Sequence, residues 1–412
     1  MEVIYDCCCG IDVHARMLVA CLYKEGQKEA RTYSTMTDDL LKLLDWLIEE
    51  GCTQVAIEST GVYWRPVFNI LEGSLSVMLV NARDAKGFKA RKTDVIDAEW
   101  LADLLRHGLL KASFIPPLGI RELRELTRYR ESVVRERTAL ANRIQKLIES
   151  GNIKLGQVIT DALGVSGKQM LRALAAGEQD AVKMSHLARR KMKRKQPEIA
   201  RALTGRLTSA QRWVLRELLD QYEQVEAAIT RAEEKIGEEI EQASDPFVGE
   251  AVKLLDTIPG VAQTIAQTIV SEIGVEMRRF PTDKQLASWA GMCPGNNESA
   301  GKRKSGKTRK GNRYLRAALV QAAWAASHQK ETYLAAQYQR LVKRMGKKKA
   351  LLAVGHAILV IVYHVLEKRA GYRELGGDYF DQRDLQKRQQ RLIHQLESLG
   401  LKVTVEQLSV AA

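Results

Sequence analysis

The chain has 412 residues, of which 45% are hydrophobic, and a formal net charge of +14. This length and apolar content exclude a disordered chain and allow two or three domains with cores of their own. The basic surplus indicates an anionic partner, and nucleic acid is the first candidate.

The six cysteines show no metal-binding or disulfide pattern. Cys7, Cys8 and Cys9 are consecutive, and no two cysteines have CxxC spacing. We therefore expect reduced, largely buried thiols in a cytosolic protein. The N-terminus has no basic segment followed by an apolar one, so no signal peptide is expected. The longest apolar run, 350–366, contains a glycine and two histidines and predicts a buried helix rather than a membrane span.

Residues 1–117 are expected to form an α/β domain. Alternating apolar runs predict strands, and apolar residues spaced by three and four predict helices. The expected strands are 7–13, 17–23, 29–34, 54–59 and 76–81, and the expected helices are 38–50, 63–72 and 93–105. Three strands followed by helix, strand, helix, strand and helix is the element order of the ribonuclease-H-like fold.

Four carboxylates occupy the places where this element order would bring side chains together. Asp12 lies in the first strand and Glu58 ends the fourth, both among Ile and Val residues, where a charge needs a reason. Asp94 and Asp97 are three residues apart and share one face of the expected helix. Together the four would form an oxygen site for Mg²⁺ or Mn²⁺. The alternative for Asp94 is a helix start after Thr93, so the prediction rests on the set.

Residues 118–245 are expected to form a coiled-coil and helical linker region. Two long charged helices, 119–150 and 209–243, carry periodic apolar residues, and they should pair with each other or with a second copy of the chain. The expected seams are Leu126, Val133, Leu140 and Leu147 in the first helix, and Leu215, Leu218, Tyr222, Val225, Ile229, Ala232 and Ile236 in the second. Between them, residues 189–195 include six basic residues and are either a phosphate-binding turn or a solvated loop.

Residues 246–375 are expected to form an all-α domain, and 376–412 a charged tail with one helix. The turn Ile258-Pro-Gly260-Val-Ala262 is similar to a helix-hairpin-helix turn, whose N–H groups would face a phosphate. A Gly-rich stretch from 302 to 316 has eight Lys or Arg and no acid, so it should lie on the surface and bind nucleic acid. The predicted nucleic-acid-binding residues are Gly260, Lys302, Arg303, Lys304, Lys307, Arg309, Lys310, Arg313 and Arg316.

In order along the chain, these motifs resemble the DEDD-type insertion-sequence transposases that use a serine, the insertion-sequence one-hundred-and-ten family and its eleven-eleven subgroup. The resemblance covers nearly the whole chain. It rests on Gly10-Ile-Asp12-Val, Glu58-Ser-Thr-Gly-Val-Tyr-Trp, Lys92-Thr-Asp94-Val-Ile-Asp97-Ala, Ile258-Pro-Gly-Val, Gly291-Met-Cys-Pro-Gly-Asn-Asn-Glu-Ser299-Ala-Gly-Lys and Lys310-Gly-Asn-Arg-Tyr-Leu-Arg316.

The resemblance implies a RuvC-like first domain, a helical C-terminal transposase domain, and a nucleophilic serine at Ser299. It implies a bacterial, nucleoid-associated DNA recombinase that acts as a homo-oligomer, a dimer or tetramer. The carboxylates of one subunit would lie beside the serine of another, and a structured RNA from the element would guide the enzyme to donor and target DNA.

Two other functions stay open at this point. One is a RuvC-like nuclease that uses water, with a C-terminal domain that only binds DNA. The other is a non-enzymatic nucleic-acid-binding protein, against which Asp12 and Glu58 argue because they would be costly in a core. Ser305 is the rival nucleophile to Ser299.

Overall fold

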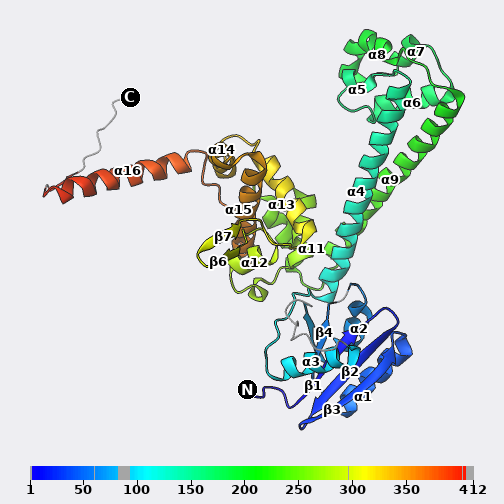
Figure 1. Cartoon of the computed structure of the whole chain (residues 1–412). Helices are drawn as coiled ribbons and strands as arrows, with labels where there is room; N and C mark the ends of the chain where they lie inside the picture. The colour runs from blue at the N-terminus through cyan, green and yellow to red at the C-terminus, as the bar shows by residue number, and fades with distance from the viewer. Residues whose placement is uncertain (1, 60, 82–92, 296, 401, 405–412) are drawn as a thin grey trace. The chain divides into compact units, whose positions relative to one another are not determined.

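The computed structural model describes residues 2–59, 61–81, 93–295, 297–400 and 402–404; it does not describe the side chains of 297–299, 303–305, 384 and 386–388. The motif residues Thr60, Lys92 and Asn296 lie outside the described residues. The chain divides into two compact units, Met1–Ile115 and Pro116–Ala412 (Figure 1).

A five-stranded mixed sheet organises the first unit. Its strand order is β3-β2-β1-β4-β5, with β1 antiparallel to β2 and parallel to β4. The strands are β1 (Cys7–Val13), β2 (Met17–Lys24), β3 (Gln27–Ser34), β4 (Gln54–Glu58) and β5 (Ser76–Val80). The helices are α1 (Thr37–Glu49), α2 (Trp64–Leu71) and α3 (Asp94–Arg106). The predicted element order is confirmed, with ends that differ by no more than two residues.

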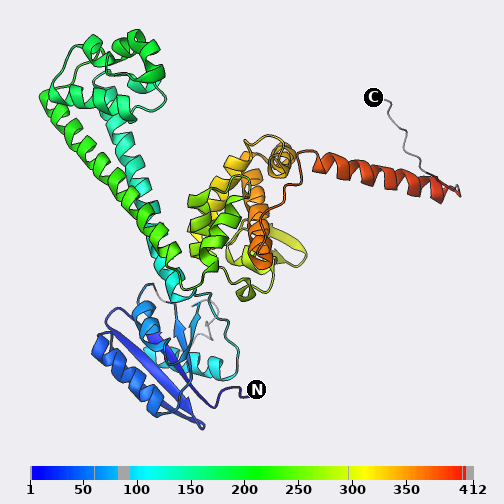
Figure 2. The same ribbon diagram turned by 180° about the vertical axis from the view of Figure 1, so that it is seen from behind.

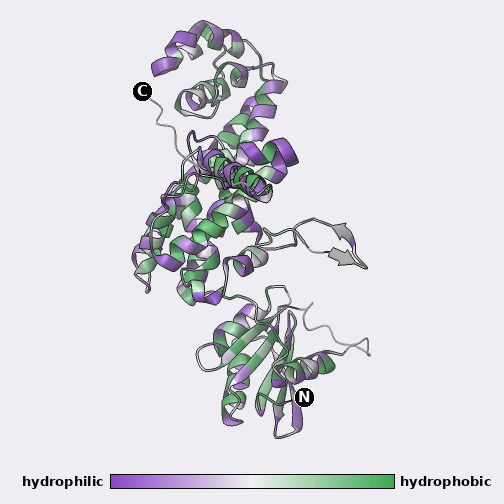
Figure 3. Ribbon diagram, turned by 90° about the vertical axis from the view of Figure 1, so that its left-hand side faces the viewer, coloured by the Kyte–Doolittle hydropathy of each residue, from purple (hydrophilic) through white to green (hydrophobic). Residues whose placement is uncertain are grey.

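Alternation along β1 gives the sheet two different faces. Cys9 and Ile11 pack into a core with α1 and α2, whereas Cys8 packs with Leu101 and Leu105 of α3. Two views from opposite sides show these helices on the two faces (Figures 1 and 2). Apart from the polar, exposed edge strand β3, the strands are largely hydrophobic, as expected for a sheet covered on both faces (Figure 3).

Two long helices, α4 (Leu118–Ser150) and α9 (Ser209–Glu241), pair within the chain (Figure 1). Between them lies a small helical cap formed by α5 (Leu155–Val158), α6 (Val165–Ala176), α7 (Ala181–Ser185), η1 (Arg190–Lys195) and α8 (Gln196–Leu203). Of the two pairing alternatives, the structure therefore contains the one within a single chain.

The predicted seam of α4 is partly wrong. Leu126 and Leu147 are only half-buried, and the buried residues are Ile120, Leu123, Thr127, Arg130, Val133, Leu140, Ile144 and Ile148. The seven-residue spacing fails because α4 contacts α11 (Gln263–Ile273) as well as α9. In α9 the prediction holds, except that Leu219 is buried while Leu218 and Val225 are half-buried.

The rest of the second unit is a helical domain around α15 (Lys347–Lys368). Its other elements are α10 (Phe247–Asp256), η2 (Met277–Arg279), α12 (Asp283–Trp289), the hairpin β6 (Asn297–Ser299) and β7 (Lys302–Ser305), α13 (Arg313–Ala326), α14 (Tyr333–Met345) and α16 (Tyr379–Ser398). By length and composition α15 could cross a membrane. Val354, Ile358 and Val362 are nevertheless fully buried, so α15 is a core helix, as predicted.

Candidate active site

Asp12 and Glu58 lie at the ends of adjacent parallel strands. The pairing of β1 with β4 runs as far as Ile11 opposite Ile57, so Asp12 and Glu58 are the next residues in register. Directly opposed residues have their side chains on the same face of a sheet. Asp12 is only 7% exposed, and Glu58 is half-buried. Both carboxylates are therefore held by rigid strands.

Gly10 allows α3 to lie directly against this face. A Cβ atom on Gly10 would be 2.4 Å from the backbone nitrogen of Ala102 and from the carbonyl oxygen of Ala98. The helix begins at Asp94, where the Thr93 hydroxyl accepts a hydrogen bond from a backbone N–H of the first turn. Close packing and the cap together hold the first turn of α3 near the end of β1.

A histidine lies between two of the carboxylates. Nε2 of His14 is 3.2 Å from Oδ2 of Asp12 and 3.3 Å from Oδ1 of Asp94. One ligand atom from each of the three residues lies within 4.8 Å of the others. Although it is this close to both carboxylates and shielded from solvent, Nε2 is not aligned for a hydrogen bond with either. The three ligand atoms are close enough together for one cation to contact all of them.

The carboxylates affect one another electrostatically. Burial raises the pKa of Asp12, His14 lowers it, and the charges of Asp97 and Asp94 raise it further, so that the pKa lies above its usual value. Asp97 thus acts on Asp12 from the same helical turn as Asp94. A bound cation would relieve this repulsion, because a nearby opposite charge favours the ionised carboxylate.

The described donors fit a divalent cation. Carboxylate oxygens suit Mg²⁺ and Mn²⁺, and an imidazole nitrogen suits the transition metals. Asp12, His14 and Asp94 would hold the ion. Glu58 follows Asp12 in strand register, and Asp97 is near enough to raise the pKa of Asp12. Sequence reasoning missed His14, which lies one residue beyond the end of β1 and comes close to Asp94 only because α3 packs on this face of the sheet.

Ser299 ends the first strand of the β6–β7 hairpin in the second unit, whose turn residues Ala300 and Gly301 are exposed. It pairs with Lys302 across a two-residue turn, in which Ala300 and Gly301 have φ values of 51° and 73°. Two positive φ values are the signature of a type I′ turn, which suits the twist of a hairpin. The backbone N–H of Gly295 donates to the carbonyl oxygen of Lys307 at 2.9 Å and extends the pairing below the hairpin.

The basic stretch lies on the surface, as predicted. Arg316 is half-buried, and exposed side chains belong to Lys302, Lys307, Arg309, Lys310 and Arg313. The side chains of Arg303 and Lys304 lie outside the description. Glycines fix the base of the hairpin: a Cβ atom on Gly311 would be 2.4 Å from the carbonyl oxygen of Ala290. The loop after the hairpin is therefore packed directly on the end of α12.

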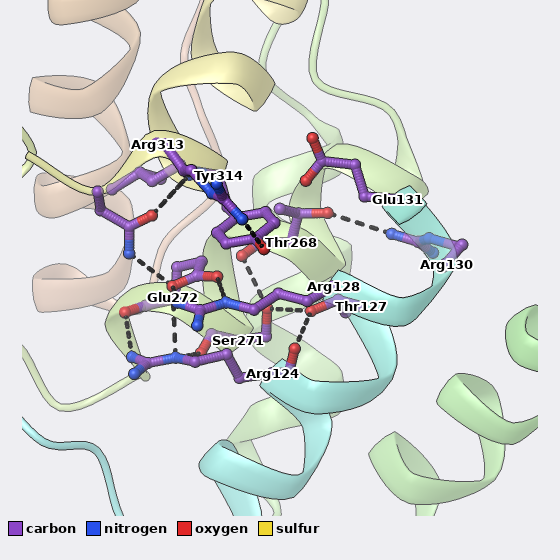
Figure 4. Close-up of polar contacts among 12 residues, drawn as sticks. Arg124, Thr127, Arg128, Arg130, Glu131, Thr268, Ser271, Glu272, Arg313 and Tyr314 are labelled. Atoms are coloured by element: carbon purple, nitrogen blue, oxygen red, sulfur yellow. Dashed lines mark hydrogen bonds and ion pairs between the residues drawn. The ribbon is translucent and has the colours of Figure 1, made fainter. Parts of the chain in front are cut away.

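A buried polar cluster holds this loop to the long helix α4 (Figure 4). Glu272 of α11 is fully buried and accepts two hydrogen bonds from Arg128, at 2.7 and 2.8 Å. Nδ2 of Asn312 donates to Glu272 at 2.5 Å, while its Oδ1 caps α13 by accepting from two backbone N–H groups. Arg124 donates to the backbone carbonyl of Glu272 at 2.7 Å. We call Arg124, Arg128, Glu272 and Asn312 the Glu272 joint.

Two further predicted contacts have a structural explanation beside the functional one. Gly260 has φ 84°, and a Cβ atom there would be 2.3 Å from the carbonyl oxygen of Ala322 in α13. Packing therefore accounts for this glycine, and its contact with phosphate stays a prediction. The segment η1 is largely exposed, which suits both a phosphate-binding turn and a solvated loop.

The chain thus combines an α/β domain that carries carboxylates at its strand ends with a helical domain that carries a basic loop on its surface, which suits an enzyme with an anionic substrate. Family comparison defines it further. The DEDD transposase family of the IS110 type matches residues 9–153, and the transposase IS116/IS110/IS902 family matches residues 252–339. Together these matches cover more than half of the chain, and the chain belongs to the IS110 family of transposases.

Two relatives extend the likeness over most of the chain. A "Probable family 20 transposase" of Pseudomonas aeruginosa is 24% identical over 327 residues, which are 77% of this chain and 85% of the relative. The transposase for insertion sequence element IS1111A of Coxiella burnetii is 22% identical over 376 residues, 89% of this chain and 87% of the relative. The protein is a transposase, an enzyme that cuts and rejoins DNA.

Proposed function

We propose that this transposase cuts and rejoins the DNA of an insertion sequence through a metal-bound carboxylate cluster and a serine nucleophile. The cluster consists of Asp12, Glu58, Asp94 and Asp97, and the serine is Ser299. The observation that carries the proposal is the convergence of Asp12, His14 and Asp94 within 4.8 Å at the strand ends. A divalent cation bound there supplies charge neutralisation on the phosphate.

The serine step conserves the energy of the phosphodiester bond. Oγ of Ser299 forms a bond to phosphorus as the bond to the leaving strand's oxygen breaks. The serine loses its proton and the leaving oxygen gains one, so cutting and later rejoining need no energy source. A free serine hydroxyl is a weak nucleophile and requires activation. The exposed basic residues that follow Ser299 bind the phosphates of the strand that is cut.

A protein–DNA adduct that survives denaturant tests this proposal. The wild type and Ser305→Ala should form it, and Ser299→Ala should not. An adduct that persists in Ser299→Ala and vanishes in Ser305→Ala would transfer the role to Ser305. No adduct from any variant, together with cleavage that requires Asp12, would support the nuclease that uses water.

A structured RNA from the element is the second partner. Two separate basic segments support it, η1 at 190–195 and the loop at 302–316, because an RNA and a duplex need separate phosphate-binding faces. The protein purified from cells that carry the whole element should enrich element-derived RNA over a charge-matched control protein. Equal recovery from both would eliminate the guide.

A further inference from the structure

A surface groove runs along the outer side of α13. Its walls include Arg313, Arg316, Val320 and Trp324 of α13 and Leu351 of α15, and its volume is about 610 Å³. The α13 residues are spaced by three, four and four, so they lie on one face of the helix. This face begins directly after the basic hairpin loop and continues away from it.

Trp324 is the unusual residue of this groove. Trp324 is 59% exposed, and the centroid of its ring lies 4.6 Å from that of His328 one turn later. A large flat apolar group kept at the surface next to other apolar groups indicates a binding site. The indole has only one polar group, its N–H donor, so most of the exposed surface of Trp324 is apolar.

The charge around the groove selects an anionic occupant. From Ser299 to Lys330 the sequence contains no Asp or Glu. In the described part of the chain Arg316 forms no ion pair. Lys347 and Lys348 are exposed and precede Leu351 by one helical turn, so they share its face. A partner that is anionic and also offers flat apolar rings is a nucleic acid.

We propose that an unpaired base of a DNA strand stacks on Trp324 while Arg313 and Arg316 hold its phosphates. The base must be unpaired, because a base inside a duplex hides both of its faces. The strand is DNA, because the enzyme exchanges DNA strands and such exchange passes through unpaired nucleotides. This stacking site would serve the proposed function, and it depends on that function only in taking DNA as the strand that is bound.

Binding of a fluorescent thymidine oligonucleotide, measured by anisotropy in EDTA, tests the groove. Trp213 of α9 is the matched control, since it is also a tryptophan and is 61% exposed. Trp324→Ala should weaken binding about tenfold or more, the range expected for one base stacked on an aromatic side chain. Trp213→Ala should bind within about twofold of wild type, and Trp324→Phe should retain most of the affinity. A duplex of the same length should bind equally to all variants.

Three results would overturn the proposal. Equal affinities of Trp324→Ala and Trp213→Ala would remove the stacking site. A larger loss with an RNA oligonucleotide than with DNA would assign the groove to RNA. Self-association that disappears in Trp324→Ala, measured by sedimentation, would assign it to a second copy of the chain. Because EDTA prevents cleavage and Ser299→Ala should bind like wild type, failure of the serine mechanism would not affect this result.

Discussion

The charge on Asp12 costs the first domain stability. Its pKa is raised, first by burial and then by Asp97 and Asp94. A carboxyl group with a raised pKa favours folding below its unfolded pKa, and this contribution is lost as the pH rises through the folded pKa. At neutral pH the ionised side chain is therefore unfavourable unless a cation accompanies it.

Asp12→Asn should consequently unfold at a higher temperature than wild type at neutral pH without metal. The difference should narrow as the pH falls below the raised pKa, where the wild-type carboxyl is also neutral. Mn²⁺ should raise the melting temperature of the wild type and leave that of Asp12→Asn nearly unchanged. Thermal melts over pH, with and without Mn²⁺, measure both effects. Identical metal responses would argue against a metal role for Asp12.

Gly10 tests how closely α3 must approach the sheet. Gly10→Ala places a methyl group 2.4 Å from two backbone atoms of α3, so the helix must shift. We expect a loss of about 1–3 kcal/mol in the free energy of unfolding, typical of overpacking, together with weaker Mn²⁺ binding. Gly73→Ala is the control, since nothing lies within 4 Å of a Cβ atom there. Urea unfolding and metal titration compare the two, and equal stability would contradict the packing argument.

At the scale of elements, the Glu272 joint connects α4, α11 and the start of α13. The buried carboxylate of Glu272 accepts hydrogen bonds from both Arg128 and Asn312. The guanidinium group of Arg128 also lies 4.4 Å from the centroid of the Tyr314 ring. A buried ion pair adds geometric specificity more reliably than stability. The joint therefore fixes where the loop that follows the β6–β7 hairpin enters the first turn of α13.

Moving the negative charge from position 272 to position 312 tests how much the contact between these two side chains contributes to stability. Glu272→Gln should destabilise by about 3–5 kcal/mol, since it removes the buried negative charge that Arg124 and Arg128 share. Asn312→Asp should also destabilise, because two carboxylates would touch, although aspartate caps a helix as well as asparagine does. The double variant restores one carboxylate and one amide and should recover part of the loss. Urea unfolding in a double-mutant cycle measures the coupling, and additive losses would contradict it.

Periodicity predicted the elements well because the helices bury one side and most of the strands are short apolar runs. It predicted the seam of α4 less well, since Leu126 and Leu147 were placed by a repeat of seven while the real partner includes α11. The identity of a packing partner is not encoded in one helix alone. For the site, strand register made Asp12 and Glu58 neighbours, whereas His14 required knowing that α3 covers that face. The contact between Asn312 and Glu272 spans 40 residues and had no local signal.

At the scale of the whole molecule, the proposed carboxylates and the proposed serine belong to different compact units. If the active site forms between subunits, two inactive variants should complement each other. Asp12→Asn and Ser299→Ala should each fail to form an adduct alone and should form it when mixed, because one protein supplies the serine and the other the carboxylates. The adduct should contain only the Asp12→Asn chain, identified by a size tag. No adduct in the mixture would indicate a site within one subunit.

Two buried cysteines of β1 can report how often each face of the sheet in the first domain is uncovered. Cys8 and Cys9 are both fully buried thiols and point to opposite faces of the sheet, one toward α3 and the other toward α1 and α2. A thiol reagent can reach Cys8 only when α3 moves away from the sheet, and it can reach Cys9 only when α1 or α2 does. The labelling rate of each cysteine therefore measures how often the helices on its own face of the sheet open. Mass spectrometry of Cys8 and Cys9 thus reports separately how often the α3 face and the α1/α2 face of the same strand are uncovered.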